Sequence, residues 1–218
     1  MKDNEHKSLR RKIKGKGLGP LLRQAISVLK SKVYLHLKLY VIIHDLGGQI
    51  PEFNPPQGYI LKELSRDEMD MLLPLVSGSR VRKYRNRIDQ GMHCFAMMRN
   101  GTVTNFLWCS TSDVVDDILG IRIPVGGGEA YSFDTVTRPE FRHRGLFFCL
   151  LIYHLHVLKS MGMLRGIAVH NAQDMLKVYP RYKKAGIPVQ IIKVIRFRRL
   201  LLWTNEHWET FDGHLVLK

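Results

Sequence analysis

The sequence predicts a mixed α/β (α+β) fold in which helices flank a central mixed sheet, and three observations carry this prediction. Its 218 residues are 45% hydrophobic and 24% charged, as in ordinary globular domains. Two strand patterns, 93–99 and 102–110, are joined by Asn100-Gly101, the preferred pair for a tight hairpin turn. Strand and helix patterns then alternate from 129 to 184. An early hairpin followed by a β-α-β-α order predicts a sheet of mixed strand direction.

The sequence predicts that residues 1–32 form a basic segment ahead of a domain at 33–218. The chain has a net charge of +15, and this segment alone contributes +8. Gly19-Pro20 and the apolar i, i+3, i+4, i+7 spacing after it predict an extra amphipathic helix over about 19–30. The basic face of this helix is compatible with weak contact to an anionic membrane or to nucleic acid. Docking of the helix on the domain is the alternative.

Two strands and two helices are predicted between this segment and the hairpin. β-branched and aromatic residues indicate strands over 33–44 and 59–64, with a proline-containing loop between them. A capping box that starts at Ser65 predicts a helix through about Val76. A further basic helix is predicted from about Arg80 to Gln90.

The second half of the chain supplies the alternating elements. After the hairpin, residues 111–128 predict a loop that ends in three glycines. The elements predicted after this loop are a strand over 129–137, a helix over about 143–161, a strand over 166–169, a helix over about 172–184 and strand-like segments at 187–198 and near the C-terminus.

Several protein classes are excluded by simple counts. The three cysteines contain no CxxC pair, so neither a disulfide framework nor a zinc-knuckle spacing is present. The longest uncharged apolar run, 145–158, has 14 residues, whereas a membrane-spanning helix needs roughly 20. The N-terminus has a basic character but no apolar core of a secretory signal. We therefore expect a cytoplasmic protein.

A candidate phosphate site lies where the strand 129–137 runs through a proline-containing turn into an apolar helix. Free backbone N–H groups at a helix start and the helix dipole favour an anion there. Gly145 lets the backbone approach a ligand closely, while Arg142, His143 and Arg144 add positive charge. The Lys-x-x-Gly-x-Gly string at 12–17 has no strand before it and is interpreted as a solvated tail segment.

Two blocks of this sequence resemble the GNAT-type N-acetyltransferases. Thr137-Arg-Pro-Glu-Phe-Arg-His-Arg-Gly-Leu-Phe147 is similar to the acetyl-CoA loop of that family, Arg/Gln-x-x-Gly-x-Gly/Ala. Asn171-Ala172 and Tyr182-Lys-Lys-Ala-Gly186-Ile187, in the expected order, resemble its second signature. The resemblance covers about 58–200 and implies a GNAT-like sheet, splayed between its middle strands, with acetyl-CoA as acyl donor and no metal.

The resemblance also implies residue roles. Backbone groups of Thr135, Val136 and Thr137 would pair with the pantetheine arm. The pyrophosphate would lie against Arg142, His143, Arg144, Gly145, Leu146, Phe147 and Phe148. Asn171 would support the other end of the cofactor, and Tyr182 would give a proton to the leaving thiolate as the acetyl group passes directly to an amine.

Three departures from the family pattern leave alternatives open. Phe147 takes the Gly/Ala position, the strand before Asn171 lacks a glutamate base, and Pro180 is expected to interrupt the helix between Asn171 and Tyr182. Tyr179 therefore competes with Tyr182 for the acid role.

Asp134 is the candidate base, with a purely strand-face or hydrogen-bonding role as its alternative. His170 is a second candidate base, against a structural role at the strand end. His154 and His156 have no HExxH partner, which argues against a metal site, and Cys149 is interpreted as a core residue.

The leading hypothesis is an N-acetyltransferase that acts on a small-molecule amine, with a homodimer as a further candidate partner. Transfer of a longer acyl chain, from acyl-CoA or acyl carrier protein, is the alternative within enzymes. A non-catalytic module that keeps the CoA pocket or binds nucleic acid is the alternative from another class. The sequence does not distinguish an amino sugar, an amino acid, a peptide N-terminus or an antibiotic as acceptor.

Overall fold

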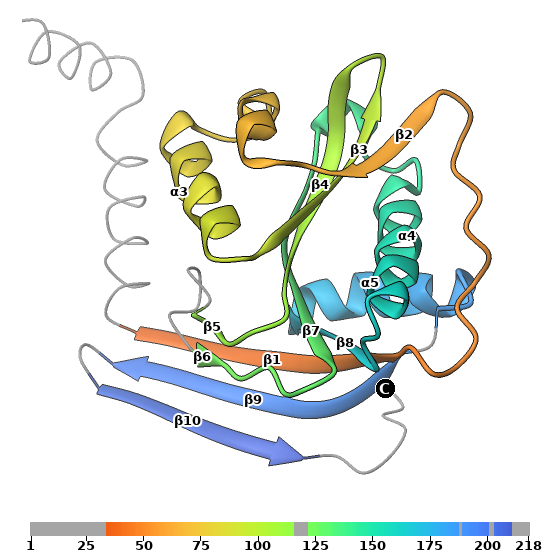
Figure 1. The fold of residues 1–218 in the computed structure, drawn as a ribbon. Helices are drawn as coiled ribbons and strands as arrows, with labels where there is room; N and C mark the ends of the chain where they lie inside the picture. The colour runs from red at the N-terminus through yellow and green to blue at the C-terminus, as the bar shows by residue number, and fades with distance from the viewer. Residues whose placement is uncertain (1–33, 116–121, 188, 201–202, 211–218) are drawn as a thin grey trace, which may run out of the picture. The chain divides into compact units, whose positions relative to one another are not determined.

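The computed structural model describes residues 34–115, 122–187, 189–200 and 203–210 (Figure 1). These residues divide into two units. The larger unit contains the described residues within 40–194 together with Thr210, and the smaller contains those in 34–39 and 195–209. The helix expected over 19–30 lies outside the described residues. The domain boundary expected after residue 32 therefore stays a prediction.

A mixed sheet forms the larger unit, as predicted. Its strands run in the order β1-β8-β7-β4-β3-β2. Their bounds are β1 Tyr34–Asp45, β2 Tyr59–Glu63, β3 His93–Arg99, β4 Thr102–Ser110, β7 Glu129–Thr137 and β8 Arg165–Asn171. The pairs β2·β3, β3·β4 and β4·β7 are antiparallel, whereas β7·β8 is parallel. The predicted Asn100-Gly101 turn joins β3 to β4, and both turn residues have positive φ, as a type I′ turn requires.

Helices cover both faces of this sheet. They are α3 Gly78–Asp89, α4 Leu146–Ser160 and α5 Ala172–Lys184, with short 3-10 helices η1 Arg66–Leu72 and η2 Pro139–Phe141. Successive residues of a strand point to opposite faces, and β7 shows which helix lies on each. Ser132 hydrogen-bonds His154 of α4, whereas the neighbouring Phe133 ring lies under Arg87 of α3. The two helices therefore pack on opposite faces.

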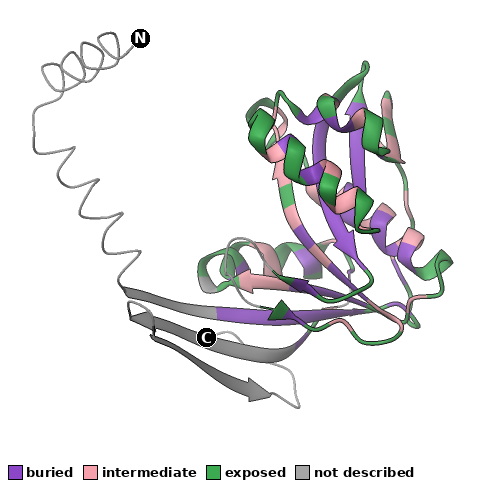
Figure 2. Ribbon diagram, turned by 60° about the vertical axis from the view of Figure 1, so that its left-hand side comes forward, coloured by how far each residue is buried: buried purple, intermediate pink, exposed green. Residues whose placement is uncertain are grey.

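The central strand β4 is buried on both sides because of these two helices. Phe106 and Trp108 pack against Tyr84 of α3, with ring centroids 5.7 and 5.0 Å apart. Leu107 and Cys109 belong to the apolar cluster under α4. Every β4 residue from Val103 onward is buried, and Figure 2 shows the inner strands enclosed by helices with exposed outer faces. A near-continuous apolar strand is typical of this two-sided covering.

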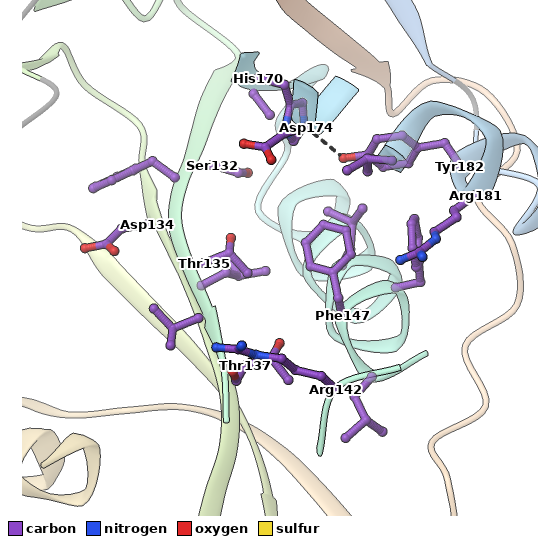
Figure 3. Close-up of a pocket in the computed structure, with 18 of the residues that line it drawn as sticks. Ser132, Asp134, Thr135, Thr137, Arg142, Phe147, His170, Asp174, Arg181 and Tyr182 are labelled. Carbon is purple, nitrogen blue, oxygen red and sulfur yellow. Dashed lines mark hydrogen bonds between the residues drawn. The ribbon is translucent and has the colours of Figure 1, made fainter. Parts of the chain in front are cut away.

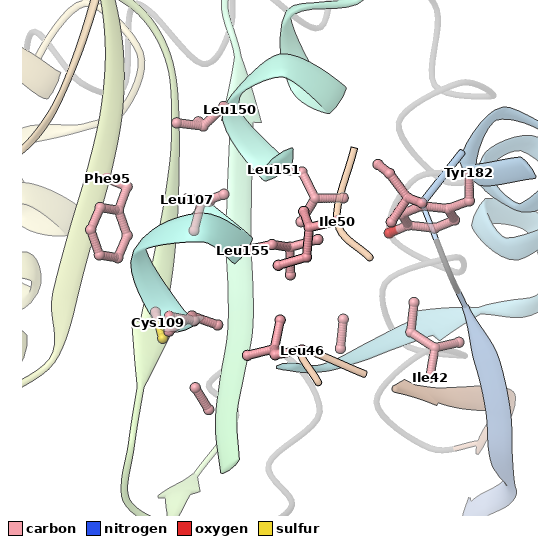
Figure 4. Close-up of a cluster of buried hydrophobic side chains, with 14 of the residues drawn as sticks. Ile42, Leu46, Ile50, Phe95, Leu107, Cys109, Leu150, Leu151, Leu155 and Tyr182 are labelled. Atoms are coloured by element: carbon pink, nitrogen blue, oxygen red, sulfur yellow. The ribbon is translucent and has the colours of Figure 1, made fainter. Parts of the chain in front are cut away.

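The main core lies under α4 and α5. It joins Ile42 and Leu46 to Leu150 and Leu155 of α4 and to Tyr182 of α5 (Figure 4). Gly166 of β8 packs against this cluster, where a Cβ would lie 3.4 Å from a Leu155 methyl carbon, in ordinary van der Waals contact. Burial of these side chains stabilises the fold by roughly 1.5–3 kcal/mol for each large apolar residue.

In the smaller unit the strand order is β10-β9-β1, with β9 at Gln190–Leu200 and β10 at Trp203–Thr210. The strand-like segment predicted at 187–198 is β9. The predicted loop 111–128 is not wholly irregular, because β5 Val114–Val115 pairs with β6 Arg122–Ile123. No helix among the described residues is long and apolar enough to span a membrane.

Three helix predictions are corrected by the structure. The helix expected from Ser65 to Val76 is the shorter 3-10 helix η1, because Pro74 has no N–H with which to continue the helical hydrogen bonds. The helix expected from residue 143 begins at Leu146, since His143 and Gly145 have φ of 62° and 76°, outside the right-handed helical region.

Pro180 does not interrupt α5, which was the third expectation. The helix runs through it from Ala172 to Lys184 and ends where the second sequence block predicted. Pro180 removes one main-chain hydrogen bond, an interior cost of about 3 kcal/mol. Burial of Met175 and Tyr182 on the inner face of the helix offsets that cost.

Candidate functional site

A cavity of about 730 Å³ opens where β7 and β8 separate. The register between these strands runs from Glu129↔Arg165 to Ser132↔Ala168 and stops there, although both strands continue. The predicted splay between the middle strands is therefore confirmed. Beyond Ser132, the edge of β7 that faces β8 has no strand partner among the described residues, so its backbone groups can hydrogen-bond a ligand.

The cavity is enclosed by β7, β8, the start of α4 and the inner face of α5 (Figure 3). Thr135, Val136 and Thr137 of β7 all line it, as do Arg142, His143, Gly145, Leu146, Phe147 and Phe148. Eleven of the thirteen predicted site residues therefore line the cavity, namely these nine, Tyr182 and Asp134. Arg144 and Asn171 are outside this lining.

The loop before α4 has the backbone geometry expected of an anion site. His143 and Gly145 have left-handed φ, and the first helical hydrogen bonds run from the Phe148 and Cys149 N–H groups to the Gly145 carbonyl. The N–H groups of Leu146 and Phe147 therefore come before the first helical hydrogen bond of α4 and have no acceptor within the helix. Turns of this kind and a helix start both present N–H groups to a negative ligand.

Arg142 is fixed beside this loop. Its Nε donates a hydrogen bond to the Thr137 carbonyl at 3.1 Å, which ties the loop to the end of β7. The remaining guanidinium nitrogens lie along the cavity. Arg144 instead lies over the Phe141 ring, with 5.6 Å from Cζ to the centroid. Of the two arginines in the predicted phosphate loop, Arg142 thus has the better placement for a ligand.

The aromatic pair at the start of α4 forms one wall. Phe147 and Phe148 contact each other edge to face with 4.8 Å between centroids, and Phe148 makes a second such contact with Tyr182 at 5.4 Å. Phe147 occupies the position where the resembling family has a small residue. Its ring lines the cavity rather than filling the backbone turn at Gly145.

Tyr182 lies at the inner end of the cavity. Its side chain is 2% exposed, and its hydroxyl is 3.2 Å from Nε2 of His170 on β8. Burial raises the pKa of Tyr182 above its usual value, and burial also lowers the pKa of His170. At neutral pH a protonated phenol therefore faces a neutral imidazole. Tyr179, the competing tyrosine, packs against the core and is outside the cavity lining.

Asn171 and Asp134 have specific structural partners. Asn171 is the N-cap of α5, where its Oδ1 accepts the Asp174 N–H at 2.9 Å. Asp134 binds Arg80, Tyr84 and Arg87 of α3, and its carboxylate points away from Thr135 and the cavity centre (Figure 3). The base role of Asp134 stays a prediction, and these contacts favour the hydrogen-bonding role that was its alternative.

Sequence reasoning missed Asn105, which anchors the start of α4. This side chain is fully buried, and its Nδ2 donates to the Leu146 carbonyl at 3.1 Å while Thr104 Oγ1 donates to its Oδ1 at 2.9 Å. The signal was a polar amide within an otherwise apolar strand pattern. Buried amides of this kind are retained where every group finds a partner.

Residues on α5 were also missed. Asp174, Val178 and Arg181 line the cavity together with the predicted Tyr182, and the four follow the i, i+4, i+7, i+8 spacing of one helical face. Extending that face upstream from Tyr182 would have identified the three missed residues. Arg80 of α3 was missed because nothing in its local sequence connects it with the strand 129–137.

No group of three or more His, Cys, Asp or Glu side chains able to hold a metal ion occurs in the part of the chain that the structure describes. His154 is a fully buried residue whose Nε2 lies 2.8 Å from the Ser132 hydroxyl. Burial lowers the pKa of His154 to about 3, with the nearby His44 and His93 contributing. It is a neutral core residue at physiological pH.

Known proteins resemble this chain in structure only. No protein-family model and no curated protein sequence matches it. A GNAT-family acetyltransferase structure from Novosphingobium aromaticivorans matches with a TM-score of 0.51 and 16% identity, over 73% of this chain and 62% of its own. A Drosophila protein matches with a TM-score of 0.53 and 12% identity, over 84% of this chain and 58% of its own.

A third match is a glucosamine N-acetyltransferase region within a fungal multi-domain β-N-acetylglucosaminidase, with a TM-score of 0.53 and 15% identity over 81% of this chain and 22% of that one. The matches thus span less than two-thirds of the length of each of these three relatives. The larger unit of this protein has the fold of the GNAT-type N-acetyltransferases, as the sequence predicted.

Proposed function

We propose that this protein transfers an acetyl group from acetyl-CoA to the primary amine of a small molecule, by direct attack in a ternary complex. One observation carries the proposal. The same cavity joins an anion-binding helix start, the unpaired edge of β7 and the buried hydroxyl of Tyr182. A phosphate-bearing carrier with an extended arm and a reactive end requires these three features in this order.

The residues at the outer end of the cavity fit the phosphates of CoA. Gly145 has φ of 76°, and a Cβ built on it would meet no atom within 4 Å. The backbone is therefore strained for any other residue, and the space beside it is open to a ligand. Arg142 and the N–H groups at the start of α4 supply donors there. Thr135, Val136 and Thr137 would hold the extended arm through their backbone groups.

When bound, the donor supplies an acetyl thioester, and this chain supplies the proton handling. Tyr182 holds a proton on Oη at neutral pH, because burial opposes the phenolate. His170 holds a free electron pair, because burial opposes the imidazolium. A phenol that can donate and an imidazole that can accept, 3.2 Å apart, suit a reaction in which an amine loses a proton and a thiolate gains one.

The cysteines support direct transfer over a thiol-bound enzyme intermediate. Burial raises the pKa of Cys94, Cys109 and Cys149 above the usual thiol value, which disfavours the nucleophilic thiolate. None of the three lines the cavity. An amine brought into the cavity would therefore react with the thioester itself.

A longer acyl group, on CoA or on acyl carrier protein, is the second candidate donor. Its support is the apolar character of the inner cavity. Leucine, phenylalanine and valine side chains form much of this wall, namely Leu107, Phe148, Leu151, Val169 and Val178. An acyl chain could bury its methylene groups there at about 0.8 kcal/mol each.

The full chain incubated with acetyl-CoA and separate primary amines tests the proposal. The panel contains amino sugars, amino acids, peptides with a free N-terminus and aminoglycosides, and butyryl-CoA and palmitoyl-CoA replace acetyl-CoA in parallel. Free CoA thiol and the mass of the amine are measured. We expect amine-dependent thiol release with one acetyl group on one class of acceptor. CoA binding without transfer to any amine would favour the non-catalytic module.

A further inference from the structure

Three side chains of α3 converge on the single carboxylate of Asp134 in β7. Arg80 Nη2 lies 2.5 Å from Oδ1, while Tyr84 Oη and Arg87 Nη1 donate to Oδ2 at 2.9 and 2.7 Å. The three donors follow the i, i+4, i+7 spacing of one helical face. The Asp134 side chain is 7% exposed. We call Arg80, Tyr84, Arg87 and Asp134 the α3 clamp.

The α3 clamp binds β7 at an irregularity of the strand. Asp134 has φ of 46°, in the left-handed region that a non-glycine residue rarely adopts. The register with β4 shifts at the same point, from Trp108↔Phe133 to Phe106↔Val136. Two residues of β7, Asp134 and Thr135, therefore stand opposite the single residue Leu107. This arrangement is a β-bulge.

The bulge changes which residues of β7 face the cavity. Phe133 lies against α3, and Val136 shares a face with Phe106, which also packs against α3. In a regular strand, residues three apart point to opposite faces. The extra residue thus reverses the alternation. Thr137 pairs with Asn105, whose amide reaches α4, so Thr137 lies on the cavity side of the sheet.

Arg87 is itself held rigidly. Its Cζ lies 5.0 Å from the Tyr84 ring centroid, 5.2 Å from that of Trp108 and 5.0 Å from that of Phe133. Its side chain is only 13% exposed. A guanidinium fixed among three aromatic faces presents its donors in one direction. The carboxylate that it binds is therefore held in one position as well.

We propose that the α3 clamp is a positioning device that holds the β7 bulge, and through it aims the backbone of Thr135–Thr137 at the acyl donor. This rests on the proposed function, because it names the residues that shape the donor side of the same cavity. Asp134 in this role acts through the backbone and takes no proton from the acceptor. Arg80 and Arg87 of α3 hold its carboxylate through one guanidinium contact to each oxygen.

Two substitutions at Asp134 separate the loss of the α3 clamp from the strain of a left-handed φ at residue 134. Asp134→Gly removes the carboxylate but allows the left-handed φ without strain, and Asp134→Asn keeps both the φ tolerance and part of the hydrogen bonding. Arg80→Gln removes one of the three donors at a side chain that is 41% exposed, so the buried core is left intact in that variant. Arg82→Gln, on an exposed position of the same helix, is the matched control.

Hydrogen–deuterium exchange of peptides that cover 133–137 and the dissociation constant for CoA are measured on the full chain. For Asp134→Gly we expect exchange at least about tenfold faster and CoA binding about tenfold to a hundredfold weaker. Arg80→Gln and Asp134→Asn should give smaller changes in the same direction. Arg82→Gln should match the wild type.

Unchanged exchange at 133–137 in a folded Asp134→Gly protein would overturn the proposal. It would also be overturned if Asp134→Asn abolished amine acetylation while exchange and CoA binding stayed at wild-type values, because Asp134 would then act as the base. If the wild type binds no CoA, the proposed function fails, and the exchange measurement still decides whether the α3 clamp holds the bulge.

Discussion

The Tyr182 hydroxyl lies 3.2 Å from Nε2 of His170, at the inner end of the cavity between β7 and β8. Burial drives both groups to their neutral forms, through a raised pKa of Tyr182 and a lowered pKa of His170. Their contact joins the end of α5 to the part of β8 that no longer pairs with β7. The separation of the two strands therefore both opens the cavity and exposes this pair to it.

Replacing Tyr182 with phenylalanine removes the hydroxyl and keeps the ring contacts with Phe148 and His44. We expect a fall in kcat of about 10²- to 10⁴-fold with little change in KM for acetyl-CoA, as for loss of a general acid. Tyr179→Phe, outside the cavity lining, is the control and should keep its rate. Steady-state thiol release measures both. A larger loss in the Tyr179 variant would transfer the acid role to that residue.

Gly145→Ala tests the anion site at the start of α4. The substitution forces a left-handed φ on alanine, which costs about 1–2 kcal/mol of stability, and places a methyl group in the open space of the loop. Gly162→Ala is matched to it, because Gly162 has φ of 79° and equally open surroundings at the other end of α4.

Thermal melts with and without CoA compare the two glycine variants. Both should have a lower Tm than the wild type in the absence of ligand. Only Gly145→Ala should lose the rise in Tm that CoA produces. Equal rises in the two variants would place the phosphate site elsewhere.

Stability should decrease in acid partly because of His154. Its pKa is about 3 in the folded state and near 6.5 in the unfolded chain, so the unfolded state binds the proton first as the pH falls. The contribution is complete above pH ~6.5 and is lost toward pH 3, at up to about 1.4 kcal/mol per pH unit.

His154→Gln provides the comparison, because its amide can still reach the Ser132 hydroxyl and does not titrate. Urea unfolding between pH 7 and 4.5 gives the free energies. The wild type should lose more stability than the variant over this range. Parallel curves for the two proteins would show that His154 is not buried as a neutral group.

Asn105→Leu should loosen the start of α4. It removes the donor to the Leu146 carbonyl and leaves the Thr104 hydroxyl without its Asn105 acceptor. We expect a loss of about 1–3 kcal/mol in the free energy of unfolding, together with weaker CoA binding. Denaturant unfolding and calorimetry measure the two effects. Lost stability with unchanged CoA affinity would show that Asn105 stabilises the core and has no part in CoA binding.

Local sequence patterns were sufficient to predict the elements whose ends carry strong sequence signals. The Asn100-Gly101 hairpin, the bounds of α5 and the loop from Arg142 to Gly145 all depend on residues close together in the sequence. The end of η1 also had a local signal, Pro74, which lies inside the helix expected through Val76. A proline has no N–H with which to continue the helical hydrogen bonds.

The surroundings of Asp134 could not be predicted in the same way. Its partner Arg87 is 47 residues away in the sequence, and their meeting depends on α3 packing across the sheet. The strand pattern of 129–137 also hides the bulge, since its composition fits a regular strand. Pro180 is the opposite case, because a local rule predicted a break that the buried face of α5 overrides.

Titration of acetyl-CoA into the wild-type full chain by calorimetry tests the central claim most directly. The cavity between β7 and β8 predicts saturable binding of one acetyl-CoA per chain, with a matching rise in Tm of the free protein. The absence of heat and of any Tm change at millimolar acetyl-CoA would contradict the proposed function.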